Sequence, residues 1–363
     1  MINYIDLIIA FLISLLLSFA LTFPVRKLAV RWGIVDLPNY RKIHTKITPR
    51  FGGIAIFISS MAGLLYLQPK NGHMAAIILG AIVIIIVGTL DDRYNVRPII
   101  KLTGQFMAAS FLISSGLIIE KVTLPFIGMI DLGFVSVLVT VLWVVGITNA
   151  INLIDGLDGL ATGVSTIALI SILIMAIIDS QLIVIYFCVV LIGSNLGFLY
   201  HNYYPAKIYM GDTGSNFLGY MIAVISMLGL FKNIAFLSFL IPILILAVPI
   251  FDTLFAMARR IKTGESIMMA DNKHIHYQLL RLGFSHRVTV LIMYGFSAVF
   301  GALAILFSKA SFMLSVIISV IAFVLIHIFA EMAGLVLDGK RPVVNFLLNI
   351  FKRRRQRKQH KEN

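Results

Sequence analysis

The sequence predicts an all-α protein built as a polytopic transmembrane helical bundle. Of its 363 residues, 60% are hydrophobic and only 13% are charged, and the mean hydropathy is +0.98. A soluble domain is typically about 45–50% apolar and about 25% charged. One globule of this size cannot bury the excess apolar surface, so we expect lipid to be the solvent for much of the chain.

Apolar segments recur along the chain, and we count eleven, each close to the roughly 20 residues that a spanning helix needs. Lipid offers no partner to a free backbone amide, so these spans are expected to be helices. The start, MINYIDLIIA, lacks a basic region and a cleavage site, which favours a retained first span. The predicted spans are residues 5–25, 51–68, 75–90, 102–119, 135–151, 162–179, 182–199, 215–230, 235–257, 289–307 and 313–334.

The distribution of basic residues predicts the orientation. The densest basic run, Lys352–Lys358, directly follows an apolar segment, as expected of a cytoplasmic tail. The N-terminus is then outside and the C-terminus is cytosolic. With this orientation, the lysines and arginines left outside are Lys70, Lys121, Lys232 and Lys309 out of 30.

The net charge of +14 does not indicate nucleic-acid binding, because the basic residues lie beside apolar segments. Basic clusters next to a membrane span contact anionic lipid headgroups. We therefore expect anionic membrane lipids, and no nucleic acid, among the partners.

Aspartates gather at the predicted cytosolic ends of the spans. A single such aspartate usually caps a helix or is solvated. Several on one face, in a chain with only 16 acidic residues, indicate a functional site, since a carboxylate at a membrane boundary is costly unless it is paired. The aspartates are Asp91, Asp92, Asp155, Asp158 and Asp212.

The spacing of these residues favours a cation. The adjacent carboxylates of Asp91 and Asp92 repel each other unless a cation or a shared proton compensates. In NLIDGLDG, Asn152, Asp155 and Asp158 are three residues apart and would line one face if the segment were helical. Ligands that are all oxygen suit Mg²⁺, which commonly bridges protein carboxylates and substrate phosphates.

Predicted cytosolic loops carry complementary positive charge. Lys46 and Arg50 lie in the first loop, Lys101 follows the LDD motif, and ADNKHIHY carries His274 and His276. The histidines are two residues apart, not the four apart of a zinc helix. For this loop we favour phosphate binding over a solvated basic loop or a transition-metal site.

Two other classes of protein are weaker candidates. A secondary transporter needs ionisable groups near the middle of the membrane, and Asp252 is the best such feature. It lies only about two turns from Arg259, however, so it reaches the cytosolic boundary and can support the site there. A structural membrane protein would not need the Asn-Asp-Gly turns.

These motifs together resemble the polyprenyl-phosphate N-acetylhexosamine-1-phosphate transferase family. Its members start O-antigen, enterobacterial common antigen and wall teichoic acid synthesis, and the muramyl-pentapeptide translocase is a relative. The IHTK segment is most similar to the teichoic-acid-initiating branch. The resemblance extends over about Asp36–Arg287 and rests on Gly52-Gly53, LDD at 90–92, NLIDGLDGLA at 152–161, MGDTGS at 210–215 and the histidine loop.

The resemblance implies a reaction at the plasma membrane of a bacterium. N-acetylglucosamine-1-phosphate would pass from UDP-GlcNAc to undecaprenyl phosphate with release of UMP, as the first lipid-linked step of a cell-wall glycopolymer. Mg²⁺ is the implied cofactor, with Mn²⁺ as the alternative. Another UDP-HexNAc or UDP-MurNAc-pentapeptide as donor, a direct or a covalent mechanism, and the oligomeric state, a homodimer included, stay open.

The resemblance also implies roles for residues and one catalytic domain, residues 1–335, with its active site facing the cytoplasm and a basic tail at 336–363. The histidine run of the family reads His-Ile-His-Tyr here, so no role is implied for Tyr277. The implied catalytic residues are Asp91, Asp92 and Asp155, and the implied metal ligands are Asp212, Asn152 and Asp155. The implied nucleotide-binding residues are Asp158, Tyr209 and Lys46, and those for phosphate and sugar are His274, His276, Arg50 and Lys101.

Overall fold

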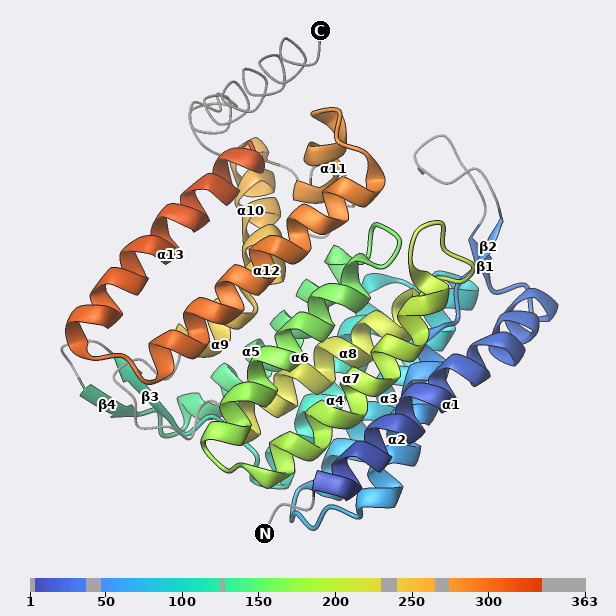
Figure 1. Ribbon diagram of the computed structural model, residues 1–363, viewed down its shortest axis with the longest axis horizontal. Coiled ribbons are helices and arrows are strands. Elements are labelled where there is room, and N and C mark those ends of the chain that lie inside the picture. The colour runs from blue at the N-terminus through green and yellow to red at the C-terminus, as the bar shows by residue number, and fades with distance from the viewer. Residues whose placement is uncertain (1–3, 37–46, 125–127, 230–239, 265–273, 335–363) are drawn as a thin grey trace, which may run out of the picture.

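The computed structural model describes residues 4–36, 47–124, 128–229, 240–264 and 274–334 and confirms an all-α bundle (Figure 1). The helices are α1 (Tyr4–Arg31), α2 (Gly53–Leu67), α3 (Met74–Tyr94), α4 (Pro98–Ser114), α5 (Val135–Ile154), α6 (Leu160–Ile178), α7 (Leu182–Asn202), α8 (Gly211–Gly229), α9 (Leu240–Ile245), α10 (Ala247–Thr263), α11 (Ile275–Arg281), α12 (His286–Ser308) and α13 (Phe312–Met332). Two short antiparallel pairs, β1 (Val35–Asp36) with β2 (Thr48–Pro49) and β3 (Lys121–Leu124) with β4 (Gly128–Asp131), accompany them.

Each predicted apolar segment coincides with a helix, except that 235–257 coincides with two. There, α9 ends at Ile245 and α10 begins at Ala247. Pro249 has no amide hydrogen to donate to the carbonyl of Ile245, and its ring crowds that carbonyl, which favours the break at this point.

Several helices of the described part are suited to cross a membrane. By length and composition these are α1, α3, α5, α6, α7, α12 and α13, while α2 and α4 are apolar but shorter. The chain is therefore a helical membrane protein. The number of eleven spans and their orientation stay predictions, as does the division at 335, because the tail lies outside the described residues.

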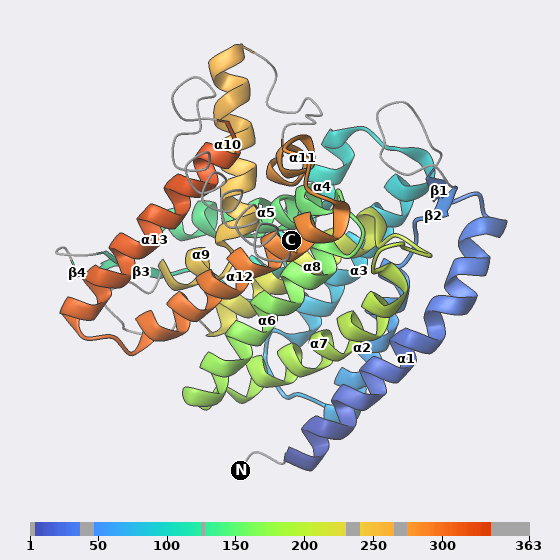
Figure 2. The same ribbon diagram turned by 45° about the horizontal axis from the view of Figure 1, so that its top comes forward.

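Helix α8 is the centre of the bundle. It packs against α2, α3, α5, α6 and α7, and every one of its residues except Asp212 is buried. Small residues such as Gly214, Gly219 and Ala223 allow the neighbouring backbones to approach closely. Helix α1 lies along one edge beside α2 and α7, and α13 lies at the opposite edge, as Figures 1 and 2 show.

The two strand pairs lie at opposite ends of the bundle (Figure 1). The pair β3–β4 was not predicted; its β-branched Val122 and Thr123 favour extended backbone. The amide of Ile119 donates to Thr140 Oγ1 at 2.9 Å and ties the hairpin to α5. The pair β1–β2 instead leads into Arg50, beside the start of α8.

Candidate active site

A pocket of about 630 Å³ opens where α8 begins. It brings together predicted residues from five separate stretches of the chain. These are Arg50, Asp91, Lys101, Asn152, Asp155, Asp158, Tyr209 and Asp212. Of the other predicted residues, Lys46 lies outside the described residues, and Asp92, His274 and His276 do not line this pocket.

The first turn of α8 is held by an aspartate from another helix. Oδ1 of Asp92 accepts the backbone amide of Asp212 at 2.9 Å. Its Oδ2 accepts both the amide and the hydroxyl of Thr213, at 3.0 and 2.7 Å. These amides have no partner within α8, so Asp92 acts as the cap of that helix. Its side chain is fully buried.

Gly211 makes this cap possible. Its φ of +73° is costly for a residue with a side chain, and a Cβ there would lie 2.5 Å from Oδ2 of Asp92. The motif MGDTGS therefore has a structural reason: glycine lets the chain turn into α8 against Asp92, and Asp212 is the next residue.

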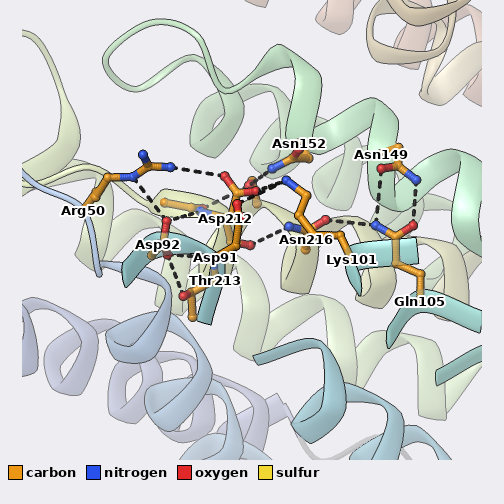
Figure 3. Close-up of polar contacts among 12 residues, drawn as sticks. Arg50, Asp91, Asp92, Lys101, Gln105, Asn149, Asn152, Asp212, Thr213 and Asn216 are labelled. Carbon is orange, nitrogen blue, oxygen red and sulfur yellow. Dashed lines mark hydrogen bonds and ion pairs between the residues drawn. The ribbon is translucent and has the colours of Figure 1, made fainter. Parts of the chain in front are cut away.

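Two cations bracket the carboxylate of Asp212. The Nη2 of Arg50 lies 3.4 Å from one oxygen of Asp212, and its Nε lies 3.2 Å from Asp92. Lys101 Nζ contacts the other oxygen of Asp212 and lies 3.2 Å from Asp91. Figure 3 shows this chain of alternating charges. Although burial lowers the pKa of Arg50, the surrounding carboxylates outweigh it and hold the pKa above its usual value.

The first loop is fastened to the segment before α8. Tyr209 donates its backbone amide to Pro49 at 2.7 Å and accepts the amide of Gly52 at 3.0 Å. A Cβ on Gly53 would lie 2.1 Å from the nitrogen of Gly214, so only glycine permits this contact between the starts of α2 and α8. The pair Gly52-Gly53 thus places Arg50 at the pocket.

The motif NLIDGLDG does not continue as one helix. Helix α5 ends at Ile154, so Asn152 lies in its last turn while Asp155 and Asp158 lie in the connection to α6. The shared helical face considered for the three residues is therefore wrong, because the glycines of the motif end the helix. The turn nonetheless directs all three into the pocket. Asp158 accepts the backbone amide of Ala206 at 2.9 Å.

The pocket carries more negative than positive charge. Asp36, Asp91, Asp158 and Asp212 line it as carboxylates, against the cations of Arg50 and Lys101. Burial, and then the charge of Asp212, raise the pKa of Asp155 to about 8. Burial, and then the charge of Asp158, raise the pKa of Tyr209 to about 12, so its phenol stays protonated. The uncompensated carboxylates are suited to a further cation.

These donors fit a hard divalent cation. Within the described ranges, no three acidic, histidine or cysteine side chains already form a metal cage. Mg²⁺ at a phosphate site does not need one, because it commonly takes one or two carboxylates and fills its shell with phosphate oxygens and water. Asn152 donates its amide nitrogen to Ser215 at 2.8 Å, which leaves the amide oxygen to face a cation.

The sequence model of glycosyl transferase family 4 matches residues 74–230, from α3 to α8. The chain is 44% identical to a probable undecaprenyl-phosphate N-acetylglucosaminyl 1-phosphate transferase of Bacillus subtilis, over 96% of this chain and 98% of that protein. The chain therefore belongs to glycosyl transferase family 4. The family 4 transferase is also 35% identical to a decaprenyl-phosphate N-acetylglucosaminephosphotransferase of Mycobacterium tuberculosis, over 80% and 79% of the two chains. An undecaprenyl-phosphate alpha-N-acetylglucosaminyl 1-phosphate transferase of Yersinia pestis is 28% identical, over 82% and 83%.

The histidine loop of the transferase is fixed by helix α10. Asp252 accepts the amide of Ile275 at 2.8 Å, and its other oxygen lies 2.9 Å from Nδ1 of His274. His276 is fully buried, and burial lowers its pKa to about 4, so it is neutral at pH 7. A Cβ on Gly156 would lie 2.3 Å from its Nε2. Both histidines support the loops of the pocket, and phosphate binding by them stays a prediction.

Other pocket residues of the transferase were not assigned from the sequence. Asp36, Tyr277 and His286 line the pocket, and Asp36 also lies 3.9 Å from Arg50. Tyr277 had no implied role, yet it lines the pocket, whereas the preceding His276 does not. In the sequence, only their position near the motifs could have indicated a role for these residues, since none of them lies in a recognisable motif of its own.

Proposed function

We propose that this transferase moves N-acetylglucosamine-1-phosphate from UDP-GlcNAc to undecaprenyl phosphate and releases UMP. The names of its relatives support the donor and the acceptor. The observation that carries the proposal is the bracketing of Asp212 by Arg50 and Lys101 in a pocket rich in carboxylates. Alternating charges suit a diphosphate and a divalent cation. The diphosphate can take the place of a carboxylate beside Arg50 and Lys101, and the cation can take the place of a basic side chain beside Asp212.

The proposed step breaks a bond between phosphorus and oxygen, not the glycosidic bond. An oxygen of the lipid phosphate attacks the β-phosphorus of UDP-GlcNAc, and the bond from that phosphorus to the bridging oxygen breaks. UMP leaves with the bridging oxygen, and the sugar keeps its bond to the transferred phosphate. Catalysis of this kind is mainly positioning and charge stabilisation.

Among the residues, the cations of Arg50 and Lys101 bind the phosphates, and Asp158 and Tyr209 face the nucleotide. Mg²⁺, with Mn²⁺ as the alternative ion, would be held by Asp212, Asp155 and the amide oxygen of Asn152. When bound, it supplies positive charge that neutralises the diphosphate and the leaving UMP. Position 46 is proposed as a further nucleotide contact from the sequence alone.

Asp91 is the proposed base for the proton that remains on the lipid phosphate. Asp91 lines the pocket, whereas Asp92 does not and already accepts hydrogen bonds from Asp212 and Thr213. A phosphate monoester has a second pKa near about 6, so at pH 7 only a minority of the acceptor needs a base. The contribution of Asp91 to kcat should therefore fall as the pH rises.

The donor is tested with a panel of UDP-GlcNAc, UDP-GalNAc and UDP-MurNAc-pentapeptide, each supplied with undecaprenyl phosphate and Mg²⁺ to the purified transferase. We expect release of UMP with UDP-GlcNAc at a kcat/KM at least about 10-fold above the others, since a polar substituent recognised by the site discriminates strongly. Faster turnover of either rival donor would replace the proposed substrate.

The proposed location is the plasma membrane of a bacterium, with the pocket facing the cytoplasm, at the first lipid-linked step of a cell-wall glycopolymer such as wall teichoic acid. Support comes from the basic residues on the predicted inner side, among them Arg50 and Lys101, and from the need for a cytosolic nucleotide sugar. The basic tail would contact anionic lipids, and a homodimer is compatible with this arrangement.

Cysteine labelling tests the orientation. The lone native cysteine, Cys188, is buried and should stay silent. A Lys70→Cys variant should react with an impermeant thiol reagent in intact cells. A Lys358→Cys variant should react only after the cells are opened, because the positive-inside bias retains the basic tail in the cytoplasm. The reverse pattern would place the pocket outside and remove its access to the nucleotide sugar.

A further inference from the structure

A cluster of three amide side chains lies one helical turn below the charged residues of the pocket. Gln105 is four residues after Lys101 on α4, and Asn216 is four residues after Asp212 on α8. Asn149 is three residues before Asn152 on α5. Each therefore lies on the same face of its helix as a proposed site residue.

The amides bond to one another across the three helices. Gln105 and Asn149 form a reciprocal pair, with nitrogen-to-oxygen distances of 3.3 and 2.7 Å. Gln105 gives its second amide hydrogen to Asn216 at 3.2 Å. Asn216 in turn donates to the backbone carbonyl of Asp212 at 2.8 Å, and Figure 3 shows the resulting chain of contacts.

The amide hydrogens of Gln105 and Asn149 are all used. Asn149 donates its remaining amide hydrogen to the carbonyl of Val145 at 2.8 Å, so both hydrogens of Gln105 and of Asn149 have acceptors. Turning the amide of Gln105 round would set its oxygen against the oxygens of Asn149 and Asn216. The arrangement is thus a single one, and polar networks satisfied in this way rigidify their surroundings.

Packing alone does not require such a cluster at this depth. Gln105 is 2% exposed and Asn216 is 4% exposed, and Asn149 is half-buried beside them. Polar side chains in a membrane interior are costly and are usually retained for a function. The cluster joins the helix that carries Lys101, the helix that carries Asp212 and the helix that carries Asn152.

We propose that Gln105, Asn149 and Asn216 form a positioning unit that sets Lys101 and the first turn of α8 relative to Asn152. This inference rests on the proposed function, since it concerns the reaction at that pocket. The unit touches no reactant. It fixes the separation of the ammonium, the carboxylate and the amide oxygen that bind the diphosphate and the cation, and an error of about 1 Å in such placement can cost about 100-fold in rate.

The first test replaces Gln105 by Met, which has a similar length and favours helices. We expect kcat to fall by about 10- to 100-fold, while KM for UDP-GlcNAc changes by less than about 3-fold. We expect kcat to change more than KM because Asp158 and Tyr209, which face the nucleotide, lie outside the three joined helices. Assays are run well below the melting temperature of each variant.

Ser226→Ala is the matched control. Trp143 Nε1 donates to Ser226 Oγ at 2.9 Å, so this change also removes a buried hydrogen bond between α5 and α8. The site is ten residues beyond Asn216, about 15 Å farther along the helix. The control should lose a comparable amount of thermal stability and keep its kcat within about 2-fold, which separates positioning from general stability.

Asn149→Ala provides a second variant if Gln105→Met does not fold. It should reproduce the loss of kcat, and the double variant should be no slower than the slower single one, because the residues act as one unit. Additive losses, or a kcat within about 2-fold of wild type with a lowered melting temperature, would overturn the proposal. A wild type that releases no UMP would overturn the proposed function, and this inference with it.

Discussion

Replacing Asp212 by Asn is expected to lower kcat by about 100-fold or more and to leave the fold intact. Among the described residues, Asp212 is the one carboxylate that contacts both Arg50 and Lys101, and the proposed cation would bind it. Its backbone is fixed independently, because its amide donates to Asp92 and its carbonyl accepts from Asn216. The loss is measured as UMP release over a titration of Mg²⁺.

Asp179→Asn is the control for that variant. Asp179 also pairs with a lysine, Lys309 at 2.8 Å, but it follows the far end of α6 from the pocket. Removing its charge should change kcat by less than about 2-fold, as is usual for an exposed ion pair. If Asp212→Asn kept more than about a tenth of the wild-type turnover at saturating Mg²⁺, Asp212 would not be a metal ligand.

Asp91→Asn is expected to reduce kcat by about 10-fold near pH 5, where about nine-tenths of the acceptor still carries its last proton, by about 2-fold near pH 6, and by little above pH 8. The sign follows from the acceptor, whose phosphate loses its last proton as the pH rises and then needs no base. The measurement is the ratio of wild-type to variant kcat across this range. A ratio independent of pH would remove Asp91 as the base and leave the metal site untouched.

Asp92→Asn separates the two neighbouring carboxylates. An amide at position 92 cannot accept all the donors that Asp212 and Thr213 direct at it, and a buried donor left without a partner costs about 1–3 kcal/mol. We therefore expect a lower melting temperature and a loss of kcat that does not depend on pH. A pH-dependent deficit in Asp92→Asn alone would exchange the roles of the pair.

A covalent route in which Asp91 attacks the β-phosphorus uses the same residue, so a loss of activity does not decide between the routes. The deciding assay contains the transferase, UDP-GlcNAc and labelled UMP, with lipid acceptor removed. Direct attack by the lipid predicts no label in UDP-GlcNAc. Label that enters UDP-GlcNAc and is absent with Asp91→Asn would establish the covalent route.

The sequence predicts the fold well because its strongest signals are local. Runs of apolar residues identify the helices, and the glycines at 52–53 and 211 mark the turns that place Arg50 and Asp212 at the pocket. The break between α9 and α10 was missed, since Pro249 lies inside an apolar run that is otherwise continuous. The hairpin β3–β4 was missed because four-residue strands leave little periodicity to detect.

The roles of the individual residues in the site could not be predicted from local signals. Adjacent helical residues point about 100° apart, so which of Asp91 and Asp92 faces the pocket depends on what packs beside α3. Likewise, nothing in the sequence joins Gln105 to Asn149 and Asn216, because the contact exists only after α4, α5 and α8 have packed. Most aspartates of the motifs line the pocket, although Asp92, His274 and His276 do not, and the partners that these residues have on other elements needed the structure.

The central claim is that a sugar phosphate, not a sugar alone, moves to the lipid. The direct measurement supplies the purified transferase with undecaprenyl phosphate, Mg²⁺ and UDP-GlcNAc labelled in the β-phosphate. The account predicts label in the lipid product and an equal amount of unlabelled UMP. Release of labelled UDP, with the sugar carried to the lipid without phosphate, would contradict it.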